Sequence, residues 1–212
     1  FLTDPACRLL TILAPGGMGK TRLAIEVAQT HLEQFEHGVW FASFVPVNAP
    51  EQMIYTLADA LGINFFGQRE PKEQLFDYLA DKEMLLVLDN LEHLLSGAGL
   101  IKELLEAVPK LKILATSRER IHLQAEHVFG LSGLAVPDSA STDAQNLDSL
   151  QLFTERAKHS RHDFVLDETT LPAVTRICKL VEGMPLAIEL AASWLRVLSV
   201  NDIANEIEKG IG

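Results

Sequence analysis

Short apolar runs alternate with amphipathic helical patterns through the first 131 residues of the chain. The runs that predict strands lie at 9–13, 39–45, 84–88, 111–115 and 127–131. The patterns that predict helices lie at 21–35, 50–62, 71–79 and around 101–108. Five consecutive apolar residues at 84–88 are typical of a strand buried on both faces. Strands that alternate with helices predict a parallel sheet with right-handed crossovers.

Within the helix predicted at 21–35, one face carries Ala24, Val27, Ala28 and Leu32. The pattern changes at 136–148, which is polar and contains Pro137, so we expect a linker there. Beyond it, helical spacing dominates. Apolar residues repeat at Val174, Ile177, Cys178 and Val181, then at Leu186, Leu190 and Trp194, before a last helix near 200–207. We therefore expect an α/β domain at 1–135, with about five parallel strands, and a small all-α domain at 149–212.

Composition adds limits on function and location. The 212 residues carry a formal net charge of -11, which argues against broad binding of nucleic acid or of an anionic membrane by these residues. No apolar run approaches the roughly 18 residues that span a bilayer. Cys7 and Cys178 match no metal or redox spacing, and this fits a reducing cytoplasm. Because the chain starts at Phe1 rather than Met, we expect it to be a piece of a longer protein.

The strongest chemical signal is Ala14-Pro-Gly-Gly-Met-Gly-Lys-Thr21, which follows a predicted strand and begins a predicted helix. Its glycines allow backbone N–H groups to converge on an anion at a helix N-terminus. Lys20 supplies positive charge for the β- and γ-phosphates, and Thr21 offers a hydroxyl to Mg²⁺. The pattern predicts a P-loop NTPase. The expected nucleotide contacts are Pro15, Gly16, Gly17, Met18, Gly19, Lys20, Thr21 and Arg22.

Asp89 ends the apolar strand at 84–88 and is the expected second Mg²⁺ ligand, because ligands of open α/β sheets bind at the carboxyl ends of the strands. Many P-loop ATPases place a carboxylate directly after this Asp to polarise water. Here that position is Asn90, which cannot accept a proton. Glu92 and His93 are the candidates to replace it. The alternative is that they belong to an ordinary helix N-terminal turn, where the helix dipole favours Glu. We expect slow hydrolysis.

The run from Leu111 to Arg118 ends in polar residues at the same predicted sheet edge. Arg118 could contact the γ-phosphate through its forked guanidinium, or it could be a surface residue paired with Glu119. A second compact motif, Glu182 to Leu190, contains Gly183, which can end one helix, and Pro185, which can start the next. This turn is either a simple helix corner or an apolar cover for the nucleotide base.

Together these motifs resemble the STAND class of signal-transduction ATPases, in its NB-ARC-like branch. That branch includes apoptosome ATPases, plant disease-resistance proteins and bacterial multidomain transcription regulators. The resemblance rests on Gly16-Gly-Met-Gly-Lys-Thr21, Leu85-Leu-Val-Leu-Asp-Asn90, Ala115-Thr-Ser-Arg118 and Gly183-Met-Pro-Leu-Ala187, which occur in the family's order. The strings Arg22-Leu-Ala24, Leu88 to His93 and Glu182 to Leu190 look most like the bacterial regulators.

The resemblance implies an ATP/ADP switch that is closed with ADP and opens and assembles with ATP. It implies that Lys20 and Thr21 hold phosphates and Mg²⁺, that Asp89 completes the Mg²⁺ shell, that Arg118 senses the γ-phosphate and that Pro185 contacts the base or sugar. The implied partners are nucleotide, other domains of the same protein and further copies of it, with DNA contact assigned to another module. Two alternatives remain: an interaction scaffold that no longer binds nucleotide, and a small-molecule phosphotransferase.

Overall fold

The computed structural model describes residues 1–137 and 147–211. By its internal contacts the chain divides into two compact units. The first, called the sheet unit, comprises Phe1–Gly16 and Lys20–Leu131, and the second, called the helical unit, comprises Gly17–Gly19 and Ser132–Gly212. Within the described residues, none of the helices is both long and apolar enough to cross a membrane.

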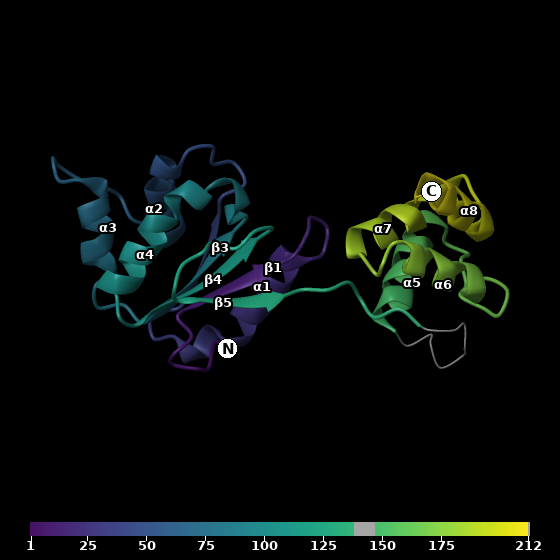
Figure 1. The fold of residues 1–212 in the computed structure, drawn as a ribbon, viewed down its shortest axis with the longest axis horizontal. Helices are drawn as coiled ribbons and strands as arrows, with labels where there is room; N and C mark the ends of the chain where they lie inside the picture. Colours follow the sequence, from purple (N-terminus) through teal and green to yellow (C-terminus); the bar gives the residue numbers. More distant parts are fainter. Residues whose placement is uncertain (138–146, 212) are drawn as a thin grey trace. The chain divides into compact units, whose positions relative to one another are not determined.

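The sheet unit contains one five-stranded sheet, in which every neighbouring pair of strands is parallel (Figure 1). Its strands are β1 (Leu9–Leu13), β2 (Val39–Ser43), β3 (Met84–Asp89), β4 (Leu111–Ser117) and β5 (Glu126–Gly130). Their order across the sheet is β2-β3-β4-β1-β5. This confirms the predicted α/β fold with about five parallel strands, and it brings all the carboxyl strand ends to one edge.

Helices cover both faces of this sheet (Figure 1). They are α1 (Lys20–Thr30), α2 (Met53–Leu61), α3 (Pro71–Leu79) and α4 (Ala98–Ala107). Short 3-10 turns at Leu32–Gln34, Pro50–Gln52, Leu91–His93 and Leu95–Gly97 connect the elements.

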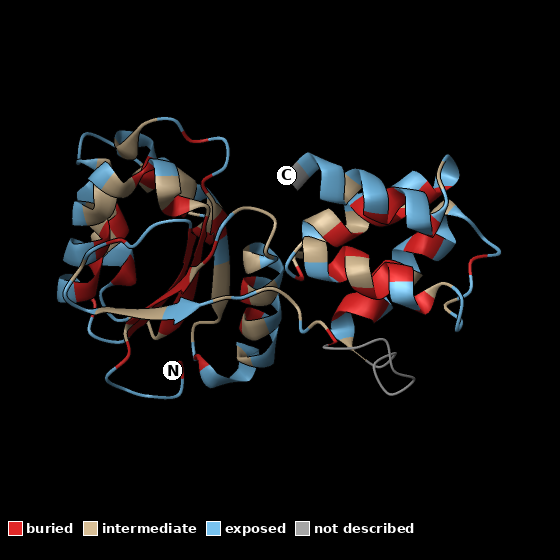
Figure 2. Cartoon of the chain, turned by 45° about the vertical axis from the view of Figure 1, so that its right-hand side comes forward, coloured by how far each residue is buried: buried red, intermediate tan, exposed pale blue. Residues whose placement is uncertain are grey.

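The apolar run in β3 shows why helices are needed on both sides. Leu86 and Leu88 belong to the core beneath α2, α3 and α4, whereas Leu85 and Val87 belong to the core beneath α1. Because successive side chains of a strand point to opposite faces, an uninterrupted apolar run must be covered twice. Figure 2 shows the resulting buried layer through the sheet.

The helix predicted at 21–35 is shorter than its pattern indicated. It ends at Thr30, and Leu32 lies in a separate 3-10 turn with its side chain half exposed. The side chains of Thr30 and His31 both bond to the Val27 carbonyl oxygen, at 2.8 and 2.7 Å. Side chains that occupy a helical carbonyl in this way compete with the backbone and favour termination of the helix.

The helical unit consists of α5 (Asp148–Ser160), α6 (Leu171–Leu180), α7 (Pro185–Ser193) and α8 (Val200–Ile211), with a 3-10 turn at Trp194–Arg196. It has its own apolar core, which includes Phe153, Ile177 and Ile188. The corner between α6 and α7 follows the sequence prediction. Gly183 adopts a left-handed φ of 68°, and Pro185 begins α7.

Two other sequence-based expectations concern this half of the chain. The repeat at Leu186, Leu190 and Trp194 is not the buried face of α7 and the 3-10 turn that follows it, because all three side chains are exposed. The buried face carries Ile188, Ala191, Ala192 and Leu195 instead. The linker predicted at 136–148 falls mainly on residues 138–146, which lie outside the described residues, and α5 already begins at Asp148.

Candidate functional site

The predicted phosphate loop connects β1 to α1. Gly17 and Gly19 have φ values of 81° and 86°, a conformation that L side chains adopt only with strain. The ammonium group of Lys20 donates to the carbonyl oxygens of Ala14 and Pro15, at 2.8 and 3.1 Å. The lysine therefore lies folded over the loop that it follows.

The electrostatic surroundings of Lys20 combine burial with three charged neighbours. Burial lowers the pKa of Lys20, the Glu92 carboxylate raises it, Arg118 lowers it, and Asp89 raises it, with a net lowering. Burial has the largest effect because it disfavours the charged form. A phosphate group beside Lys20 would supply a further negative charge and favour the ammonium form.

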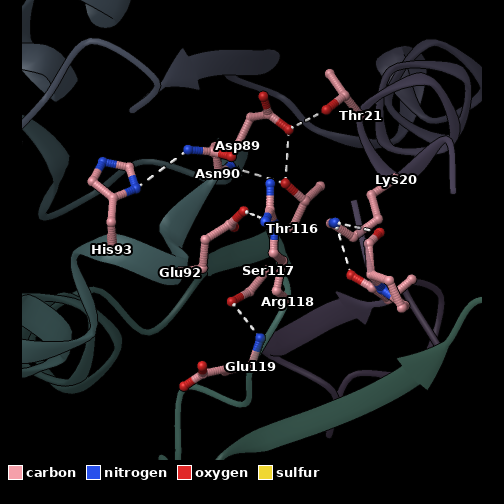
Figure 3. A network of polar contacts seen from close by, with 12 residues as sticks. Lys20, Thr21, Asp89, Asn90, Glu92, His93, Thr116, Ser117, Arg118 and Glu119 are labelled. Carbon is pink, nitrogen blue, oxygen red and sulfur yellow. Dashed lines mark hydrogen bonds and ion pairs between the residues drawn. The ribbon is translucent and has the colours of Figure 1, made fainter. Parts of the chain in front are cut away.

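Asp89 is the centre of the polar cluster at the sheet edge. It is 4% exposed, and its Oδ1 accepts from the hydroxyls of Thr21 and Thr116, both at 2.7 Å (Figure 3). The parallel sheet explains this convergence, because β4 lies between β1 and β3 and all three end at the same edge. The structure thus brings together Thr21 and Asp89, the two predicted Mg²⁺ ligands.

The backbone after Asp89 turns sharply at Asn90, which has a left-handed φ of 69°. The Asn90 N–H donates to Thr116 Oγ1 at 2.9 Å, and the 3-10 turn Leu91–His93 follows. His93 Nε2 lies 2.6 Å from the Val47 carbonyl oxygen, and its Nδ1 lies 3.2 Å from Asn90 Nδ2. Since a carbonyl only accepts, Nε2 carries the hydrogen and Nδ1 accepts from the Asn90 amide. Both ring nitrogens of His93 are therefore engaged.

Glu92 points back toward the phosphate loop and forms an ion pair with Arg118, with 3.0 Å between Oε1 and Nε (Figure 3). This pairing differs from the sequence-based alternative of an Arg118–Glu119 pair. The hydrogen bond that Glu119 makes in this region comes from its backbone N–H, which donates to Ser117 Oγ at 3.2 Å. Glu92 Oε2 is buried and has no hydrogen-bond partner within the described residues.

Gly16 allows Arg118 to approach the loop closely. A Cβ atom placed on Gly16 would lie 3.2 Å from Arg118 Nη2 and 3.4 Å from Cζ. The absence of a side chain at Gly16 therefore leaves room for the guanidinium above the phosphate loop. Sequence spacing alone did not indicate this contact.

The remaining predicted residues come from the loop, from α1 and from α7. Pro15 and Arg22 are exposed, the latter on the first turn of α1, and Met18 is half-buried. Pro185 begins α7 and belongs to the helical unit.

The residues present fit a Mg²⁺-nucleotide. The loop has left-handed glycines before a helix N-terminus, which suits phosphate binding. A threonine hydroxyl and a buried carboxylate lie in direct contact, and both are oxygen ligands of the kind that Mg²⁺ prefers. The buried, unpartnered Oε2 of Glu92 adds a polar atom that a ligand or its water could satisfy.

No protein-family model matches the chain. A predicted HTH-type transcriptional regulator of Mycobacterium tuberculosis is 36% identical over 202 residues, covering 95% of this chain and 22% of the relative. The chain therefore spans about a fifth of the length of this relative.

Two solved structures show the same fold at low sequence identity. The ORC2 protein of Aeropyrum pernix, in ADPNP–ADP complexes, matches with a TM-score of 0.55 at 14% identity, over 95% of this chain and 60% of that one. A STAND protein of Pyrococcus horikoshii with a tetratricopeptide repeat sensor matches with a TM-score of 0.51 at 14% identity, over 96% and 30%. The chain thus has a P-loop NTPase fold followed by a helical domain.

Proposed function

We propose that this chain is the ATP/ADP-binding switch module of a signal-transduction or transcription regulator in the NB-ARC-like branch of STAND ATPases. The observation that carries the proposal is the 2.7 Å contact between Thr21 Oγ1 and Asp89 Oδ1, beside the glycine loop and Lys20. The similarity to an HTH-type regulator supports a regulatory role for the whole protein. DNA contact would then belong to residues outside this chain, consistent with its charge of -11.

Each residue of the site has a defined task in this proposal. Backbone N–H groups of 16–19 and the Lys20 ammonium bind the phosphates, and Thr21 and Asp89 hold Mg²⁺. Bound Mg²⁺ supplies charge neutralisation at the phosphates. Arg118 contacts the γ-phosphate, and Pro185 contributes an apolar contact to the base or sugar.

Glu92 is the residue that we assign to hydrolysis. Its carboxylate takes a proton from the attacking water as that water's oxygen bonds to the γ-phosphorus and the bond to the β–γ bridging oxygen breaks. The products are ADP, inorganic phosphate and a proton. Hydrolysis is slow, because Asn90 occupies the position directly after Asp89 and cannot accept a proton. A slow reaction suits a switch, since the ATP-bound state persists long enough to act.

Asn90 also favours the second candidate, a scaffold that no longer binds nucleotide. The two are separated by isothermal titration of the full-length protein with Mg-ATP and with ADP. Binding of both nucleotides supports the switch, and binding of neither supports the scaffold.

Lys20→Ala provides the residue-level test of the same proposal. Removing a charged donor to phosphate should raise the Kd for ATP about 10- to 100-fold. Lys102→Ala, on the exposed face of α4, is the matched control and should bind like the wild type, because Lys102 pairs with Glu106 at the surface, away from the phosphate loop. Equal affinities for the wild type and Lys20→Ala would contradict the assignment.

A further inference from the structure

Arg118 and Glu92 differ strongly in how firmly the structure holds them. The Arg118 side chain is 62% exposed, whereas the Glu92 side chain is 15% exposed. An exposed arginine loses much side-chain entropy when it is fixed in one geometry. The Glu92 carboxylate is thus largely shielded from solvent, whereas most of the Arg118 side chain is exposed.

Glu92 is rigid because its short turn is fixed on both sides. Before it, the Asn90 N–H donates to Thr116 Oγ1, which itself donates to Asp89. After it, the His93 ring donates to the Val47 carbonyl oxygen. These bonds tie the turn to the ends of β3 and β4 and to Val47, four residues after the end of β2, so the position of Glu92 is set by the edge of the sheet.

Because Glu92 is anchored in this way, we infer that it is a positioning residue for Arg118. Its Oε1 holds the guanidinium through Nε over Gly16, so that the terminal nitrogens are ready for a γ-phosphate. This inference rests on the proposed function, because it assigns to Glu92 the ability of the site to distinguish ATP from ADP.

The form of the ion pair indicates that Glu92 orients Arg118 without occupying its terminal nitrogens. In a bidentate pair, two guanidinium nitrogens engage both carboxylate oxygens. Here Oε2 of Glu92 has no hydrogen-bond partner, so the second oxygen does not engage a terminal nitrogen. Nη2 instead lies 3.2 Å from the position of a Gly16 Cβ, directly above the loop. Arg118 Nη2 therefore already lies beside Gly16 of the phosphate loop while Nε is paired with Glu92.

The test compares binding of ADP with that of a non-hydrolysable β,γ-imido ATP, both with Mg²⁺, by calorimetry on the full-length protein. Glu92→Ala should weaken binding of the ATP analogue about 3- to 10-fold more than binding of ADP. Arg118→Ala should show a loss of discrimination at least as large. The double variant should equal Arg118→Ala alone, because Glu92 acts through the arginine.

Two further variants separate positioning from general disruption. Glu119→Ala removes the adjacent exposed carboxylate and should keep the wild-type ratio of affinities. Glu92→Gln retains an oxygen that can accept from Arg118 and should keep part of the discrimination, even if Glu92→Ala folds poorly. An NMR signal from the Arg118 Nε–H in the nucleotide-free protein should shift in Glu92→Ala and remain unchanged in Glu119→Ala.

Several outcomes would overturn the inference. An increased affinity of Glu92→Ala for the ATP analogue would show that Glu92 restrains Arg118 instead of presenting it. Additive losses in the double variant, or an unchanged ratio in both Glu92 variants, would show that the two residues act independently. If the wild-type protein binds neither nucleotide, the proposed function fails as well. If the wild-type protein binds both nucleotides and Glu92→Ala distinguishes the ATP analogue from ADP as well as the wild type does, only this inference fails.

Discussion

Thr116 connects the buried carboxylate to the backbone that follows it. Its hydroxyl donates to Asp89 Oδ1 at 2.7 Å and accepts from the Asn90 N–H at 2.9 Å, and the residue is 1% exposed. One hydroxyl therefore satisfies two buried polar groups at the end of β3. When a buried polar group loses its partner, the loss of folding free energy exceeds the net stabilisation that the hydrogen bond contributes.

We therefore expect Thr116→Val, which preserves shape but removes both bonds, to lower the free energy of unfolding by about 1–3 kcal/mol. Denaturant unfolding followed by circular dichroism measures this change. Thr56→Val is the control, because within the described residues Thr56 Oγ1 bonds only to the Gln52 carbonyl oxygen, and Thr56 is a half-buried residue of α2. A loss no larger than that of the control would mean that the Thr116 hydroxyl is energetically unimportant.

At the scale of single elements, α7 has two overlapping rows of apolar residues, and only one of them is buried. Ile188 is fully buried in the core of the helical unit, while Leu190, two residues later, is 54% exposed. The small side chains of Ala191 and Ala192 lie on the buried face, and this allows a close approach to neighbouring helices.

This arrangement predicts different costs for two similar substitutions in one helix. Ile188→Ala should destabilise the protein by about 2–5 kcal/mol, because it leaves a cavity. Leu190→Ala should cost less than about 1 kcal/mol, since most of that side chain already contacts water. Thermal unfolding of both variants provides the measurement. Equal losses would place Leu190 in the core and contradict the observed exposure.

The elements themselves were largely predictable from the sequence, because strand and helix periods differ. The run at 84–88 and the alternating pattern before residue 131 predicted the parallel sheet, which the structure confirms. The buried face of α7 was not predictable in the same way. Both the row with Leu186 and the row with Ile188 have helical spacing, and the larger apolar side chains lie on the exposed one.

The site was predictable where strand ends alone determine the geometry. Asp89 and Thr21 meet because parallel strands end at one edge, and residue spacing already indicates this. The Arg118–Glu92 pair depends on the left-handed backbone at Asn90, which turns Glu92 back toward the loop. Such a backbone state cannot be read from local spacing, and for that reason the sequence suggested Glu119, and not Glu92, as an ion-pair partner of Arg118.

For the molecule as a whole, each unit is built around apolar cores of its own and contains a single buried cysteine. Cys7 belongs to a core of the sheet unit and Cys178 to the core of the helical unit. Burial raises the pKa of Cys178 to about 12, and burial also raises the pKa of Cys7, although Lys112 opposes that shift.

Both thiols should therefore stay protonated and inert toward iodoacetamide at pH 8 in the folded protein. In an unfolded chain a cysteine has a pKa of about 8.5, so each thiol should react once its own unit opens. Mass spectrometry of peptides after labelling in increasing urea would report the two units separately. Rapid labelling of Cys178 in the absence of urea would contradict its burial in the core.

The order of the strands also affects how the protein is made. Leu9, near the start of the chain, pairs with Ile113 in β4 and Glu126 in β5, so β1 gains its neighbours only about a hundred residues later. At a synthesis rate of about 5–20 residues per second, the ribosome needs several seconds to deliver them. During that interval β1 is an apolar segment without a neighbouring strand, and the glycine loop follows it directly. Nascent chains of this protein should therefore be targets for chaperones until β4 and β5 have emerged.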